Sequence, residues 1–196
     1  IDPDYLDDPI LLEYVESLWQ PLVAKGRALG HVTPDLDARF AWESFLVRDP
    51  SVNAFALPGG YVGVHLGLIG ITQSRDELAS VLAHELSHVT QRHIARGIAS
   101  NARRSLVGLV ALVLGMIAAS KSSSPDAMQA VVAGSQAAVL QGQLNFSRDV
   151  EREADRIGFQ ILTGAGFAPS GMASMFERMD VSTRLNDYGN YPYLRS

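Results

Sequence analysis

The sequence predicts an α+β protein that is mostly helical, with a small antiparallel sheet of about three strands. Apolar residues recur at helical spacing in both outer parts of the chain, whereas short runs rich in Phe, Trp, Val and Tyr are confined to residues 39–64. Turn residues at Asp49-Pro50 and Pro58-Gly59-Gly60 divide these runs into a three-strand meander. A length of 196 residues and an apolar share of 47% favour one domain, covering residues 1–196.

Each predicted helix has a start signal. Asp8-Pro9 provides an N-cap and a first-turn proline, although Pro21 should kink or end the helix that follows. Ser74 and Glu77 form a capping box before the next apolar stripe. A long helix is predicted to run from residue 147 to 164, and Ser170 should cap a last helix that ends near residue 179.

Residues 106–119 form an apolar segment, LVGLVALVLGMIAA, without a polar side chain on any helical face. A helix of this length spans roughly 21 Å, less than the ~30 Å core of a bilayer, so we predict no transmembrane span. The segment could pair with residues 127–140 in a helical hairpin, cover a functional cleft, or contact a membrane surface or a partner. Residues 121–125, KSSSP, have the composition of a flexible connection.

Charge and cysteine content exclude several classes of protein. A net charge of −5 opposes binding to a phosphate backbone, so no nucleic-acid partner is expected. Because the chain has no Cys, it can form no disulfide, and any metal site must use His and carboxylates. The chain opens without Met or a signal-like segment, so we expect any leader to have been removed or left out.

The strongest motif is HELSH, residues 84–88, which lies within the helix capped by Ser74. His84 and His88 are four residues apart and therefore share one helix face, where two imidazoles can bind the same metal ion. Zn²⁺ favours such ligands, and a catalytic zinc site has three protein ligands and one open position. Glu85 would then lie close enough to a water in that position to act as a general base.

A third ligand must come from another segment. Glu151 and Asp155 are also four residues apart on one predicted helix, so one could bind the metal while the other orients a His ring. Taken alone, this stretch is more typical of a solvated, charged helix face than of a metal site.

HELSH, together with SRDVEREAD at residues 147–155, resembles the paired HExxH and ExxxD motifs of the M48 metallopeptidases. The likeness extends through VNAFALPGGYVGV and ADRIGFQIL, over about residues 7–180, and is greatest to the periplasmic group of β-barrel assembly-enhancing proteases. It implies a zincin-like fold with an active-site helix and one Zn²⁺ per chain. By this resemblance His84, His88 and Glu151 are the zinc ligands, Glu85 is the catalytic residue, and Asp155 orients His84.

The resemblance also implies a polypeptide substrate, bound in extended form beside a strand at residues Asn53, Ala54, Phe55 and Ala56. Unfolded or misassembled proteins would suit such a site, because folded proteins rarely offer a free extended segment. A second donor to the developing oxyanion is expected, and the sequence does not rank its candidates: His65, Arg148, Tyr188, Tyr191 and Tyr193.

Location and partners follow from the resemblance alone. It implies a periplasmic protein of envelope quality control that acts with the outer-membrane assembly machinery, with peripheral membrane contact through residues 106–119 as an option. Related proteins continue into repeat helices where this chain ends, so we expect a protease module of a longer protein. The alternative is a catalytically silent or self-inhibited zinc-binding scaffold, in which residues 106–124 could cover the cleft. A membrane-embedded protease would require a spanning segment.

Overall fold

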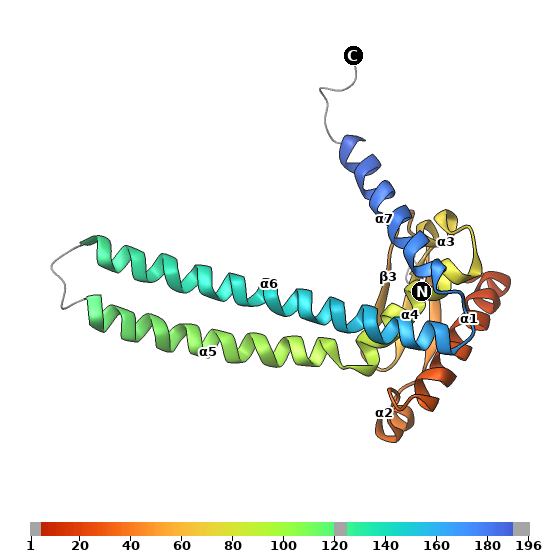
Figure 1. Cartoon of the computed structure of the whole chain (residues 1–196), viewed down its shortest axis with the longest axis horizontal. Helices are drawn as coiled ribbons and strands as arrows, with labels where there is room; N and C mark the ends of the chain where they lie inside the picture. Colours follow the sequence, from red (N-terminus) through yellow and green to blue (C-terminus); the bar gives the residue numbers. More distant parts are fainter. Residues whose placement is uncertain (1–4, 120–124, 190–196) are drawn as a thin grey trace, which may run out of the picture. The chain divides into compact units, whose positions relative to one another are not determined.

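The computed structural model describes residues 5–119 and 125–189, and the chain divides into two compact units (Figure 1). The first unit combines residues 1–91 with residues 153–196, and the second contains residues 92–152. Residues 121–124 of the predicted flexible connection, and residues 190–196 of the tail, lie outside the described part of the chain. The expectation of a single domain remains a prediction.

The second unit is built from two helices, α5 (His93–Ala119) and the larger part of α6 (Pro125–Gly164), which run side by side in Figure 1. This arrangement agrees with the hairpin reading of the apolar segment. Several apolar side chains on α5 are exposed, among them Leu106, Leu109 and Leu114. Within residues 5–119 and 125–189, no helix combines the length and the hydropathy that crossing a membrane requires.

The first unit contains a four-stranded sheet in the order β1 (Tyr5–Leu6), β2 (Glu43–Val47), β4 (Tyr61–His65), β3 (Ala54–Leu57). The α+β class is therefore confirmed, but the predicted three-strand antiparallel meander is wrong in its pairing. β2 and β4 are parallel, while β1 pairs with β2 and β3 pairs with β4 in antiparallel fashion. The two-residue β1 is too short to give a sequence signal.

Glycines in the β3–β4 hairpin explain this pairing. Gly59 and Gly60 take positive φ angles of 97° and 83° in the turn, which brings β4 back between β2 and β3. Gly63 in β4 is the register partner of both Phe45 and Phe55. These two rings meet edge to face, 5.8 Å apart, in the space that a side chain at Gly63 would fill. Gly63 therefore lets the two aromatic rings pack across the central strand.

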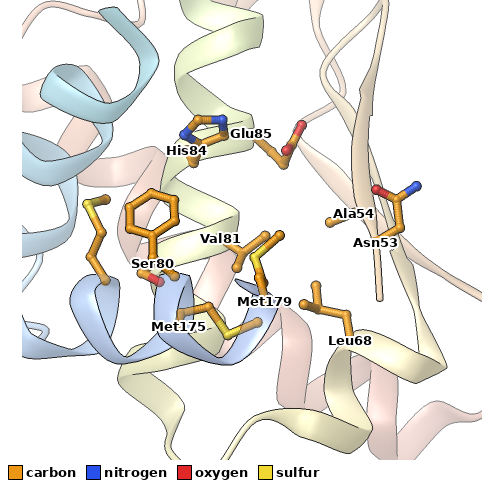
Figure 2. A pocket seen from close by; sticks show the side chains of 11 residues that line it. Asn53, Ala54, Leu68, Ser80, Val81, His84, Glu85, Met175 and Met179 are labelled. Carbon is orange, nitrogen blue, oxygen red and sulfur yellow. The ribbon is translucent and has the colours of Figure 1, made fainter. Parts of the chain in front are cut away.

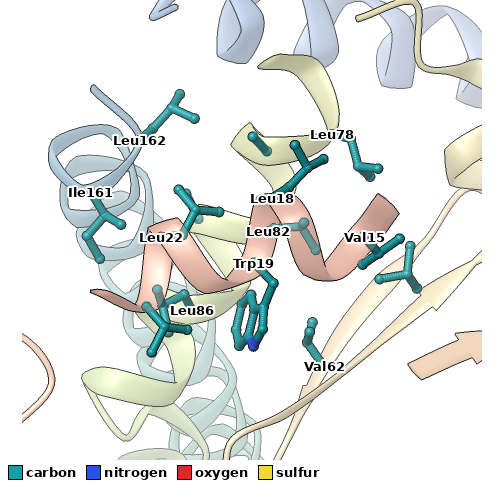
Figure 3. Close-up of a cluster of buried hydrophobic side chains, with 14 of the residues drawn as sticks. Val15, Leu18, Trp19, Leu22, Val62, Leu78, Leu82, Leu86, Ile161 and Leu162 are labelled. Carbon is teal, nitrogen blue, oxygen red and sulfur yellow. The ribbon is translucent and has the colours of Figure 1, made fainter. Parts of the chain in front are cut away.

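The hydrophobic core of the first unit surrounds α4 (Arg75–Thr90) (Figure 3). Helix α1 (Pro9–Ala28) packs on α4, and fully buried Trp19 and Leu22 lie among Leu82, Leu86 and Ile161. The unit also contains the short helices α2 (Pro34–Arg39) and α3 (Leu66–Ile71), as well as α7 (Ser170–Gly189), which contacts α4. Since α4 is surrounded by α1, β3, β4 and α7, its side chains are held in a well-packed setting.

Candidate active site

The site is built on α4, whose start is fixed by the predicted capping box. The Ser74 hydroxyl accepts a hydrogen bond from the Glu77 N–H at 3.2 Å, and the Glu77 carboxylate accepts one from the Gln73 N–H at 2.7 Å. Burial favours the neutral form of Glu77, but the hydrogen bonds from Gln73 and Arg178 outweigh it and lower the pKa of this carboxyl. Glu77 is therefore a buried, ionised anchor at the helix N-terminus, where a negative charge is also favourable.

His84 and His88 lie on one face of α4, as their spacing predicts. Their Nε2 atoms are 3.0 Å apart, and both side chains are partly buried. The two nitrogens therefore converge on one small volume. This is the arrangement that a chelating pair requires, provided that each Nε2 carries a lone pair and each Nδ1 carries the proton.

Helix α6 approaches α4 closely at this point because residue 158 is a glycine. A Cβ atom at Gly158 would lie 3.2 Å from main-chain atoms of both Ala83 and His84, which leaves little room for a side chain. Asp155, one turn earlier, places its Oδ1 3.0 Å from Nδ1 of His84. A carboxylate at this distance favours a proton on Nδ1, in which case the lone pair of Nε2 can bind a metal ion.

Glu151 lies one helical turn before Asp155 on α6. One possible ligand atom from each of His84, His88 and Glu151 lies within 4.8 Å of the other two. Two imidazoles and a carboxylate form a donor set typical of catalytic zinc, so these residues fit a divalent cation. The sequence left Glu151 and Asp155 as alternatives for the metal ligand and for the residue that orients a His ring. In the structure Asp155 is the carboxylate that contacts Nδ1 of His84.

Glu85 and His84 line a pocket with about 550 Å³ of empty space, part of it open to solvent (Figure 2). Asn53 and Ala54, at the start of β3, lie on its other side. β3 is the last strand in the sheet order, so one of its edges has no partner strand among the described residues. Phe55 belongs instead to the aromatic cluster, where its ring lies 5.6 Å from that of His65, and Ala56 does not line the pocket.

Of the candidate oxyanion donors whose side chains the structure describes, neither His65 nor Arg148 lines this pocket. Nδ1 of His65 lies 2.7 Å from the Ser51 hydroxyl and 3.7 Å from Asp49. Ser51 and Asp49 both approach the same ring nitrogen of His65, whereas in a Ser-His-Asp triad each ring nitrogen has its own partner. These three residues therefore do not form a triad. Their contacts join the β2–β3 link to β4. Arg148 belongs to the second unit. Tyr191 and Tyr193 fall outside the described residues, and Tyr188 is near the end of α7.

The sequence did not identify α7 as part of the pocket. Its lining residues are Met172, Met175, Phe176 and Met179, at spacings of three, four and seven residues. That helical period was visible in the sequence, but it is equally typical of a helix that only packs against the core.

Comparison with known proteins decides the family. Residues 27–192 match the family model described as Peptidase family M48. This chain belongs to peptidase family M48. A Vibrio cholerae protein provisionally named a β-barrel assembly-enhancing protease is 41% identical over 174 residues, which are 89% of this chain and 34% of that protein. The β-barrel assembly-enhancing protease of Escherichia coli strain K12 is 36% identical over 174 residues, again 89% of this chain and 34% of that protein.

A second group of relatives carries a different name. The mitochondrial metalloendopeptidase OMA1 of Arabidopsis thaliana is 31% identical over 167 residues, covering 85% of this chain and 32% of that protein. The chain therefore spans about one third of the length of these M48 relatives. The recognised M48 resemblance and the zincin-like α+β class are both confirmed.

Proposed function

We propose that the chain is the protease module of a zinc endopeptidase that hydrolyses peptide bonds in unfolded or misassembled proteins. The observation that carries this proposal is the pair of Nε2 atoms on His84 and His88, 3.0 Å apart, with Asp155 on the opposite ring nitrogen of His84. Membership of family M48 supports the same reaction class.

His84, His88 and Glu151 would hold the metal ion, one per chain. Their nitrogen and carboxylate donors suit Zn²⁺ better than Mg²⁺ or Ca²⁺, which prefer oxygen ligands alone. When bound, the ion supplies Lewis acidity to the scissile carbonyl and lowers the pKa of water beside it.

Protein groups carry out the proton transfers and the positioning. Glu85 follows His84 on α4 and lines the pocket, so it can accept the proton of the attacking water and deliver it to the leaving nitrogen. Asp155 keeps His84 in the tautomer that exposes Nε2. The edge of β3 that has no partner strand in the described part of the chain, with Asn53 and Ala54 at the pocket, can pair with an extended substrate main chain. Such pairing selects little by side chain.

The test is a Glu85→Gln variant assayed on unfolded casein. We expect at least a hundredfold loss of turnover with unchanged zinc content, because Gln keeps the shape of Glu but cannot accept a proton. Glu13→Gln, an exposed position on α1, is the matched control and should retain full activity. Equal cleavage by parent and Glu85→Gln, with zinc bound in both, would remove Glu85 as the general base.

The same test separates hydrolysis from the alternative, a catalytically silent or chaperone-like zinc module. A metal site that only stabilises the fold uses closed coordination and gains nothing from a carboxylate at the pocket, so the position of Glu85 favours hydrolysis. A scaffold would bind unfolded casein without cutting it in either form of the protein.

Location and partners belong to the same proposal. The names of the bacterial relatives support a periplasmic protein that works in envelope quality control beside the outer-membrane assembly machinery. Peripheral membrane contact through residues 106–119, and a self-inhibited state in which residues 106–124 cover the cleft, remain predictions. Deleting residues 106–124 should raise peptide turnover if that cover exists.

A further inference from the structure

One wall of the pocket is a stripe of sulfur-containing and aromatic side chains on α7, the helix that packs on α4. It consists of Met172, Met175, Phe176 and Met179 (Met175 and Met179 are labelled in Figure 2). Met175 is fully buried, whereas Phe176 is 49% exposed. Since both residues line the pocket, the stripe extends from the core to an accessible part of the pocket wall.

The remaining walls are also apolar away from Glu85. Val81 on α4, Leu68 on α3 and Ala54 on β3 complete them, and the polar atoms come from Asn53, Ser80 and the His84-Glu85 pair. Among the described residues of this lining, Glu85 is the only Asp, Glu, Lys or Arg. A charged side chain of the substrate would lose its hydration without gaining a partner at the α7 end of the pocket, which disfavours its binding.

The methionines allow the pocket to accommodate apolar substrate side chains of different shape. The unbranched, polarisable side chain of Met has three rotatable bonds and adapts to guests of different shape. Three such residues in one wall therefore suit linear, branched and aromatic side chains alike, such as those of Met, Leu and Phe. Side chains of this kind are buried in folded proteins and become available when a chain is unfolded.

Two polar anchors fix this wall in place. The Arg178 guanidinium donates to both carboxylate oxygens of Glu77, at 3.1 and 3.0 Å, and to the Gln73 side chain at 2.6 Å. Just before α7, the Ala168 N–H donates to the Asp76 carboxylate at 3.1 Å. Because both anchors attach to the start of α4, the methionine stripe is held in a fixed position beside α4.

We propose that this pocket is a specificity pocket that binds one large apolar side chain of the substrate, in a residue adjoining the scissile bond. The proposal rests on the proposed function, since it places the guest beside Glu85 and His84. It predicts that the enzyme cuts next to Leu, Met or Phe and discriminates against Asp, Lys and Ala at the same position.

The first measurement is cleavage of a peptide series that differs only at the residues flanking one bond. We expect kcat/KM to be at least about tenfold higher with Leu, Met or Phe than with Ala, since filling an apolar pocket discriminates by this order. Phe176→Ala should enlarge the pocket and shift the preference at least fivefold toward Trp. Phe159→Ala, which truncates a ring on α6 that is 44% exposed and does not line the pocket, should leave the preference unchanged.

A binding measurement keeps the proposal testable if one of these variants misfolds. The Glu85→Gln variant should bind the Leu peptide at least about tenfold more tightly than the Ala peptide, as measured by fluorescence anisotropy without turnover. Cleavage and binding that are indifferent to the flanking residue, in a parent enzyme that depends on Glu85, would overturn the pocket proposal and leave the proposed function intact. If no peptide is cut by the parent and Glu85→Gln changes nothing, the proposed function fails instead.

Discussion

Gly158 sets the distance between the two helices of the site. His84 lies on α4 and Asp155 on α6, and their 3.0 Å contact requires the two main chains to pass close together. A Cβ atom at residue 158 would lie 3.2 Å from Ala83 and His84 main-chain atoms, which cannot move away as a flexible side chain could. A single missing methyl group is thus coupled to the orientation of the His84 imidazole, a proposed metal ligand.

We predict that Gly158→Ala weakens metal binding with little change in stability. Alanine improves helix propensity by about 1 kcal/mol, which offsets part of the strain of moving α6. The longer distance from Asp155 to His84 should lower metal affinity by roughly 10–100-fold, the usual effect of losing a carboxylate that supports a ligand. Competition titration with a zinc-binding dye measures the affinity, and thermal unfolding measures the stability.

Asp155→Asn is the matching variant, because it weakens the same contact without moving α6. Gly134→Ala is the control, since a Cβ at that glycine on α6 meets no other atom within 4 Å. Unchanged zinc affinity in both Gly158→Ala and Asp155→Asn would show that the Asp155 contact does not support the metal site.

The elements of the site were foreseeable where their signals are local, and not where they depend on packing. Ser74 and Glu77 predicted the start of α4, and HELSH predicted a two-imidazole face, because caps and i, i+4 spacing act within one helix. α1 instead continues past Pro21, whose side chain is exposed while Trp19 and Leu22 are buried, so burial of the apolar side chains outweighs one lost hydrogen bond. The parallel β2–β4 pair likewise depends on contacts across Gly63 that no local pattern encodes.

The ion pair between Arg178 on α7 and Glu77 on α4 gives a pH-dependent contribution to stability. Burial alone would raise the pKa of Glu77, but the hydrogen bonds from Gln73 and Arg178 lower it below the value of an unfolded glutamate, about 4.3. The stabilisation is therefore fully present above about pH 4.3 and is lost as pH falls through the lower, folded pKa. Glu77→Gln should destabilise the protein by roughly 2 kcal/mol at pH 7 and by clearly less at pH 3.

Urea unfolding of the parent and of Glu77→Gln at pH 7 and pH 3 measures this difference. The other carboxyls titrate in both proteins and their effects cancel. The change with pH in the difference between the two free energies of unfolding therefore isolates Glu77. Glu177→Gln, an exposed position on α7, is the control and should give a small difference at both values of pH. A Glu77→Gln difference that stays constant or grows toward pH 3 would contradict a lowered pKa for this carboxyl.

At the scale of the whole molecule, the first unit is discontinuous in sequence. It is formed by residues 1–91 and 153–196, with the residues of the second unit between them in the chain. α4 and the end of α6 therefore come together only when segments more than sixty residues apart in sequence have folded. Because the proposed ligands lie on these two helices, an unfolded chain offers no preformed site, and metal binding is coupled to folding.

We therefore predict that removing the metal lowers the melting temperature. A ligand that binds only the folded state stabilises it by about 2.7 kcal/mol at a hundredfold excess over its Kd. For a chain of this size each kcal/mol corresponds to about 2–4 °C, so chelation should lower Tm by roughly 5–10 °C and added Zn²⁺ should restore it.

His84→Ala should melt at the lower temperature with or without the chelator, because it lacks one imidazole of the chelating pair. His31→Ala, which changes a histidine in the turn after α1, should keep the full response. If the parent and His84→Ala respond equally to the chelator, the stabilising ion is bound elsewhere and the HELSH site is not the metal centre.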